Sequence, residues 1–188
     1  MKRYARCSLL LMICTACTRT TSVSTNNPMA PSASGLSSIS VPENFRAHLS
    51  GDEVAPPLPL ATLAQGQAVF KLLPSGTELS YKVMASNIEN VVGAHIHLAA
   101  AGLRGPLVAL LLTPIPSAAG GRIDGVIADG TLTAAGLFGP LAGQPLSALM
   151  EAIQAGNAYV DVPTNDGIAP PNTGPGDYPG GELRGQVR

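Results

Sequence analysis

Aromatic and charged side chains are scarce in this sequence, and each scarcity excludes a class of function. Of the 188 residues, 4% are aromatic, none is Trp and only 12% are charged. Single-stranded nucleic acids are bound by aromatic rings set beside basic residues, and duplexes by dense positive charge. The chain has too little of either, so nucleic acid is not an expected partner.

Cysteine is confined to the start of the chain, at Cys7, Cys14 and Cys17. Everything after Cys17 therefore has no disulfide framework and no thiolate metal site. Hydrophobic residues make up 45% of the chain, mostly as Ala, Leu and Val. That is enough to build a core, and the core alone must hold the folded part together.

The first 16 residues are typical of an export signal. Lys2, Arg3 and Arg6 precede a short apolar stretch, residues 8–16. A helix needs about 20 residues to cross a bilayer, so this stretch is too short to span one and fits a secretory signal. Those three residues belong to the 11 basic residues, so 8 basic residues remain against 12 acidic ones. The exported part is therefore mildly acidic.

The signal ends in Cys14-Thr15-Ala16-Cys17. This sequence resembles a bacterial lipobox, in which small residues precede the modified cysteine, although Cys14 stands where Leu is usual. The resemblance implies a signal peptide over residues 1–16, cleavage before Cys17, and lipidation of Cys17. Several acyl chains would hold the protein at a membrane surface, where one chain binds only marginally. The alternative is an ordinary cleaved signal with incidental cysteines.

Residues 17–43 are rich in Ser, Thr, Asn and Pro and contain little to bury. Such a composition predicts a solvated, disordered tether. We therefore expect a folded domain over residues 44–188, held by this tether at a membrane of the cell envelope. The domain would face the periplasm or the exterior.

Short strands dominate the predictions for residues 44–188. Residues 45–50 alternate apolar and polar side chains, which predicts a half-buried strand. Segments 67–73 and 78–84 flank Pro74-Ser75-Gly76-Thr77, a typical hairpin turn. Further strands are expected at residues 91–98, 107–112, 121–127, 158–162 and 182–187.

One helix interrupts this pattern. Pro145 suits a first helical position, apolar residues follow it at helical spacing, and Gly156 can end the helix. Many short strands with frequent Gly and Pro favour a sandwich or barrel. The expected fold is therefore mainly β, an antiparallel Greek-key-like β-sandwich with one short helix.

An ordered series of motifs over roughly residues 45–188 resembles the CHRD (chordin) domain. The most specific are Ala94-His95-Ile96-His97 in the middle and Gly-Gly-Glu-Leu-Arg-Gly-Gln, residues 180–186, at the end. Gly105-Pro106 and Tyr159-Val160 also match in order. The resemblance implies a β-sandwich of the kind found in chordin-type extracellular antagonists and in bacterial exported proteins. It does not imply a settled activity.

The pair His95 and His97 is the strongest chemical signal. Two residues apart in a strand, they leave the same face, while Ala94, Ile96 and Leu98 take the face expected to line the core. Two imidazoles side by side can supply two nitrogen ligands to Cu or Zn.

A metal site needs further ligands. The CHRD resemblance implies a third His after the Tyr-Val strand, but this chain has Pro163 there, which cannot ligate. His48 points away from the core face of the first strand and could replace it. The supporting or alternative oxygen ligands are Glu53, Asp161 and Glu182. The other interpretation of the His pair is structural, with both rings packing and hydrogen-bonding under loops.

No phosphate-binding loop, nucleophile elbow or zinc-protease motif is present, and no catalytic residue is expected. Two hypotheses follow. The first is a lipid-anchored, non-enzymatic binding or structural module that contacts an envelope or extracellular protein. The second is a protein that binds Cu or Zn through His95 and His97. The Gly- and Pro-rich residues 166–179 indicate a loop insertion.

Overall fold

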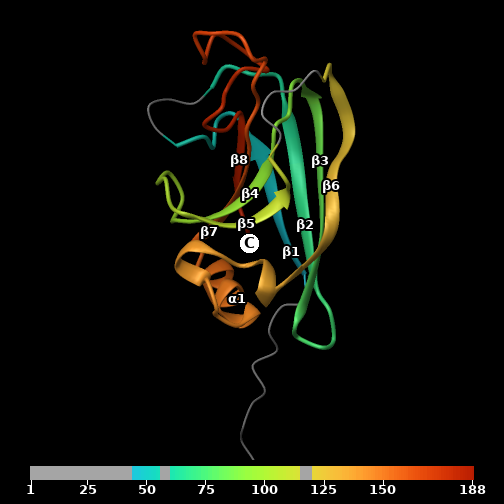
Figure 1. Ribbon diagram of the computed structural model, residues 1–188, viewed down its shortest axis with the longest axis vertical. Helices are drawn as coiled ribbons and strands as arrows, with labels where there is room; N and C mark the ends of the chain where they lie inside the picture. The colour runs from blue at the N-terminus through green and yellow to red at the C-terminus, as the bar shows by residue number, and fades with distance from the viewer. Residues whose placement is uncertain (1–43, 56–59, 115–119) are drawn as a thin grey trace, which may run out of the picture. The chain divides into compact units, whose positions relative to one another are not determined.

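Eight strands form one continuous antiparallel sheet in the order β5-β4-β7-β8-β1-β2-β3-β6 (Figure 1). The computed structural model describes residues 44–55, 60–114 and 120–188. The strands are β1 (Asn44–Ser50), β2 (Gln65–Leu72), β3 (Glu78–Ile88), β4 (Ala94–Leu98), β5 (Leu107–Leu112), β6 (Ile123–Thr133), β7 (Ala158–Val162) and β8 (Leu183–Gln186). With the helix α1 (Leu146–Gln154), they confirm the prediction of a mainly antiparallel β fold with one helix.

The predicted signal peptide, the predicted lipidation site Cys17 and the predicted tether over residues 17–43 lie outside the described residues. Within the described ranges, no helix combines the length and the apolarity that crossing a bilayer requires.

The sheet bends so that its two halves face each other around a shared core. Figure 1 shows β1, β2, β3 and β6 on one side and β4, β5, β7 and β8 on the other. Strand β1 illustrates the pattern, because Phe45 and Leu49 are buried while Arg46 and His48 are exposed. The bend requires β8 to approach β1 closely at Gly185, where a Cβ would lie 1.8 Å from the backbone oxygen of His48. Only glycine fits there.

One hydrogen bond connects the two halves of the sheet, and a separate segment covers the outer edge at β5. The hydroxyl of Tyr81 in β3 donates to the backbone oxygen of Leu111 in β5 at 2.8 Å. On the outer edge of β5, Ala109 forms an isolated bridge with Leu137, and the backbone N–H of Phe138 donates to the oxygen of Val108 at 3.0 Å. Short 3₁₀ turns at Ala134–Gly136 and Gly139–Leu141 flank this segment.

The helix α1 packs an apolar face onto the core beside β7, burying Leu146, Leu149, Met150 and Ile153. The sequence predicted Pro145 as the first helical residue, but the helix begins at Leu146 and Pro145 is its N-cap residue. Gly156 follows the helix with a φ of 71°, the left-handed conformation that glycine adopts readily.

The largest differences from the predicted strand boundaries are in β3, β4 and β6. Strand β4 begins only at Ala94, because Val91 forms an isolated bridge to Thr164 instead of joining the ladder. Strands β3 and β6 are longer than predicted and pair with each other as far as Ile88 and Thr133. Their added length includes polar residues and register shifts, which interrupt the alternation that sequence reading relies on.

Candidate metal centre

The two faces of β4 have opposite chemistry. Ala94 and Ile96 are completely buried in the core. The side chains of His95 and His97 leave the opposite face and are 13% and 17% exposed. The imidazole pair therefore points away from the apolar interior, as the alternation predicts, yet it is largely covered.

The neighbouring strand β7 brings a carboxylate to the pair. Asp161 stands directly opposite His95, and Tyr159 stands opposite His97. One oxygen of Asp161, Oδ1, lies 3.3 Å from Nδ1 of His95 and 3.2 Å from Nε2 of His97. One ligand atom from each of the three residues lies within 4.8 Å of the others, the spacing of a metal-binding group.

The ring of His97 is held from two sides. Its Nδ1 lies 2.9 Å from the backbone oxygen of Gly105, which can only accept, so Nδ1 carries a proton and Nε2 faces Asp161. The ring also stacks on Tyr159, with ring centroids 5.0 Å apart. The hydroxyl of Tyr159 in turn accepts a hydrogen bond from the backbone N–H of Gly105 at 3.2 Å.

Two glycines support the imidazole pair by lacking a side chain. A Cβ on Gly105 would lie 1.8 Å from the backbone oxygen of Leu98, so only glycine fits at this position of the loop that holds His97. A Cβ on Gly93 would lie 2.6 Å from Nε2 of His95. The sequence marked Gly105 as part of a Gly-Pro motif, but nothing in it indicated that Gly93 contacts a histidine.

The charges of the cluster stabilise one another. Burial lowers the pKa of His97, but the Asp161 carboxylate and the Gly105 carbonyl raise it more, so that the pKa lies above 6.5. Burial likewise raises the pKa of Asp161, and the two imidazoles outweigh that effect and lower the pKa below 3.8. The guanidinium of Arg184 lies 3.5 Å from the centre of the Tyr159 ring, near the same carboxylate.

The polar atoms at the centre of the cluster lack aligned hydrogen bonds. Nε2 of His97 and Oδ1 of Asp161 are buried, and neither has a hydrogen-bond partner among the described residues although they lie 3.2 Å apart. Nε2 of His95 is also buried without a partner. Buried polar atoms without partners are rare and costly, so these three atoms are the ones at which a further group could bind.

A cavity of about 20 Å³ lies beside Asp161. Its lining includes Arg104, Tyr159, Gly181 and Arg184. A cavity of this volume holds about one water molecule, and neither His95 nor His97 lines it.

The other predicted ligands do not join the cluster. His48 lies in β1, and β7 and β8 separate β1 from β4. At the usual spacing of strands, His48 is roughly 14 Å from the pair. The sequence correctly predicted that His48 points away from the core. It could not predict the strand order that separates His48 from the pair, because the alternation of apolar and polar residues carries no information on strand order.

The two glutamates have other surroundings. Glu182 is completely buried, where it accepts hydrogen bonds from the hydroxyls of Thr62 and Thr164 and from the backbone N–H of Gly176. Glu53 is exposed, and its carboxylate interacts electrostatically with the guanidinium of Arg184. Neither glutamate is in the group with the histidines, and the centre therefore consists of His95, His97 and Asp161.

The sequence was compared with protein families, with curated proteins and with solved structures. The model of the CHRD domain matches residues 45–187, which include every strand from β1 to β8 except the first residue of β1. No curated protein and no solved structure matched the chain. Because the family model covers well over half of the sequence and spans the sheet that carries the His pair, this chain belongs to the CHRD-domain family.

Proposed function

We propose that this chain is an exported, lipid-anchored CHRD-domain protein of the cell envelope that binds a copper or zinc ion through His95, His97 and Asp161. The proposal treats the domain as a non-enzymatic binding module. Its role would be to hold the ion at a membrane surface, for storage or protection.

One observation carries the metal proposal. Two imidazole nitrogens lie 3.3 and 3.2 Å from the same carboxylate oxygen, yet that oxygen has no hydrogen-bond partner among the described residues. Two ligand atoms roughly 2.0–2.1 Å from a tetrahedral metal ion stand about 3.3 Å apart. The separations therefore suit a shared cation better than they suit hydrogen bonds.

The donor set fits the proposed ions. Neutral imidazole nitrogens suit both copper and zinc, and a carboxylate oxygen is a usual third ligand of zinc. The Gly105 carbonyl fixes the proton of His97 on Nδ1, the role that carbonyls play behind metal-binding histidines.

Metal analysis of the purified protein tests this proposal. The wild-type protein should take up one equivalent of Zn²⁺ or Cu²⁺ after dialysis, and His95→Ala, His97→Ala and Asp161→Asn should each weaken binding about tenfold or more. His48→Ala is the matched control, because His48 lies in another part of the sheet and should keep full binding. Metal content unchanged in the three cluster variants would leave the His pair a packing element under loops.

The anchor needs a separate experiment. A full-length Cys17→Ser protein should lose its acyl chains and move from the membrane fraction to the soluble envelope fraction. Cys7→Ser is the control, since Cys7 lies within the expected signal peptide and should leave the fractionation unchanged. Retention of the Cys17→Ser protein on membranes would exclude this mode of attachment.

A further inference from the structure

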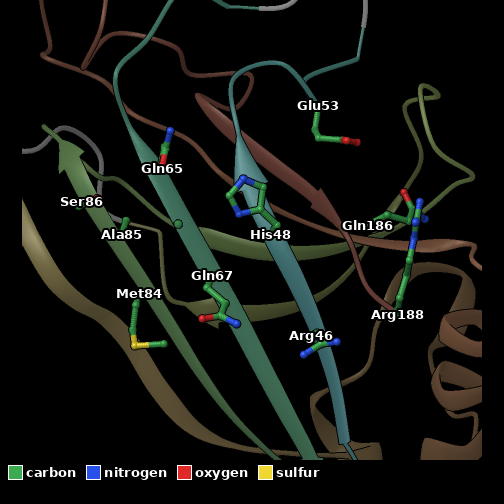
Figure 2. A pocket seen from close by; sticks show the side chains of 11 residues that line it. Arg46, His48, Glu53, Gln65, Gln67, Met84, Ala85, Ser86, Gln186 and Arg188 are labelled. Carbon is green, nitrogen blue, oxygen red and sulfur yellow. The ribbon is translucent and has the colours of Figure 1, made fainter.

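A second feature lies on the outer face of the other half of the sheet. Two adjoining hollows, of about 770 and 910 Å³, share Arg46, Gln67 and Arg188 in their linings. Together they form one elongated depression, which we name the outer groove. It is lined by residues of β1, β2, β3 and β6 and by the C-terminal residues. Figure 2 shows the side chains that line the first of the two hollows.

Positive charge is concentrated in this groove although the domain is acidic. Residues 44–188 contain seven basic and eleven acidic residues. Four of the seven basic residues line the groove, against two of the eleven acidic residues, Glu53 and Asp129. The four are Arg46, Lys71, Lys82 and Arg188. The groove is thus a local positive surface on a negative domain.

These four cations are available to a ligand. All four side chains are exposed, and within the described part of the chain none of them forms an ion pair or a side-chain hydrogen bond. Asp129 stands opposite Lys82 in the register of β3 and β6 but forms no ion pair with it. Figure 2 shows Arg46 and His48 on β1 beside Gln65 and Gln67 on β2.

Neutral hydrogen-bonding groups lie between the charges. Gln65 and Gln67 point outward from β2, and Ser80, Ser86 and Thr131 line the groove from β3 and β6. Amides and hydroxyls both donate and accept, as recognition of sugar hydroxyls requires. We propose that the outer groove binds an extended acidic polysaccharide, with carboxylates meeting the four cations and hydroxyls meeting the amide and hydroxyl side chains.

The shape and composition of the groove favour this ligand over others. A flat lipid surface would not reach side chains inside a depression, and the groove offers only one exposed ring, the imidazole of His48, on which nucleic-acid bases could stack. A flexible polyanion can lie along it, and complementary charge would speed its association. The groove and the metal centre share no residue, so this proposal does not depend on the metal.

The test is calorimetric titration of the full domain with soluble polygalacturonate, with neutral dextran and with vesicles of phosphatidylglycerol. We expect binding to polygalacturonate that weakens as salt rises, and none to the other two. Arg46→Gln and Lys82→Gln should each reduce the affinity about tenfold, since each removes a charged hydrogen bond. Gln67→Ala should reduce it less while leaving the charge unchanged.

The matched control is Arg122→Gln, which removes one positive charge from an exposed ion pair with Asp124 outside the groove. It should retain the wild-type affinity for polygalacturonate. An equal loss in Arg122→Gln and Arg46→Gln would overturn the groove as the site and leave only a general charge effect. Failure of the wild-type protein to bind polygalacturonate, or binding to the vesicles instead, would overturn the proposed ligand.

Discussion

Asp161 in β7 faces two histidines of β4 at once, because it stands directly opposite His95 and diagonally opposite His97. The same oxygen atom lies 3.3 Å from one ring and 3.2 Å from the other. An aspartate in place of Tyr159 would instead stand directly opposite His97 and diagonally opposite His95. The antiparallel register therefore decides which carboxylate serves the pair.

The first prediction concerns the pKa of His97 in metal-free protein. We expect an NMR titration of the ring to give a pKa above 6.5, because the Asp161 carboxylate outweighs the effect of burial. In Asp161→Asn the carboxylate charge is gone, and the pKa of His97 should fall below its wild-type value. An unchanged pKa in that variant would mean that Asp161 does not interact with the ring in solution.

The second prediction concerns the stability of the metal-free domain as a function of pH. The raised pKa of His97 contributes stability that is complete below 6.5 and is lost as pH rises through the folded-state pKa. The lowered pKa of Asp161 contributes stability that is complete above 3.8 and is lost as pH falls through its folded-state pKa. The interaction should therefore stabilise most between pH 3.8 and 6.5.

A double-mutant cycle measures that interaction. Urea unfolding of wild type, His97→Gln, Asp161→Asn and the double variant at pH 5 should give a coupling free energy of about 1 kcal/mol. At pH 9 the coupling should be smaller, because the ring is then neutral. A coupling that grows between pH 5 and pH 9 would contradict the assigned charges.

The third prediction concerns Gly93. Its alanine variant places a Cβ 2.6 Å from Nε2 of His95, so the ring must move away from its position beside Asp161. We expect Zn²⁺ affinity to fall about tenfold, measured by competition with a chromogenic chelator. Gly121→Ala is the control, because a Cβ there meets no atom within 4 Å and should change nothing. Equal affinity in the two variants would argue against His95 as a ligand.

The fourth prediction concerns Glu182, which holds three segments together. It accepts hydrogen bonds from Thr62, Thr164 and Gly176, and it is completely buried. Glu182→Gln should lower the free energy of unfolding by about 2–3 kcal/mol, because it weakens charge-assisted bonds and adds donors that face other donors. Glu151→Gln on the exposed side of α1 should change it little, and urea unfolding compares the two.

Much of the fold could be predicted because local alternation reports local burial. Residues 107–112 and 158–162 form strands with the predicted bounds, since residues 107–112 are all apolar and only Asp161 is charged in 158–162. Strand β6 runs past its predicted end because Asp129, Gly130 and Thr131 hide the pattern. Its extension depends on pairing with β3, which is a distant contact.

The candidate site could be predicted only in part, for the same reason. The outward direction of His95 and His97 follows from neighbours in the sequence. Whether His48 or Asp161 reaches the pair depends on which strand lies beside β4. That strand is β7, which is more than 50 residues from β4 in the sequence. The sequence could not show that Glu182 is not a ligand, because its hydrogen-bond partners Thr62 and Thr164 come from two other parts of the chain.

The segment that borders β5 also affects how copies of the protein behave when crowded together. An uncovered outer strand offers a row of backbone donors and acceptors to any passing chain, which is a common route to edge-to-edge aggregation. Here Leu137 and Phe138 already occupy backbone groups of Ala109 and Val108. A neighbour that tried to extend the sheet at this edge would first have to displace them, so crowded copies of the protein are less able to start fibrous assembly there.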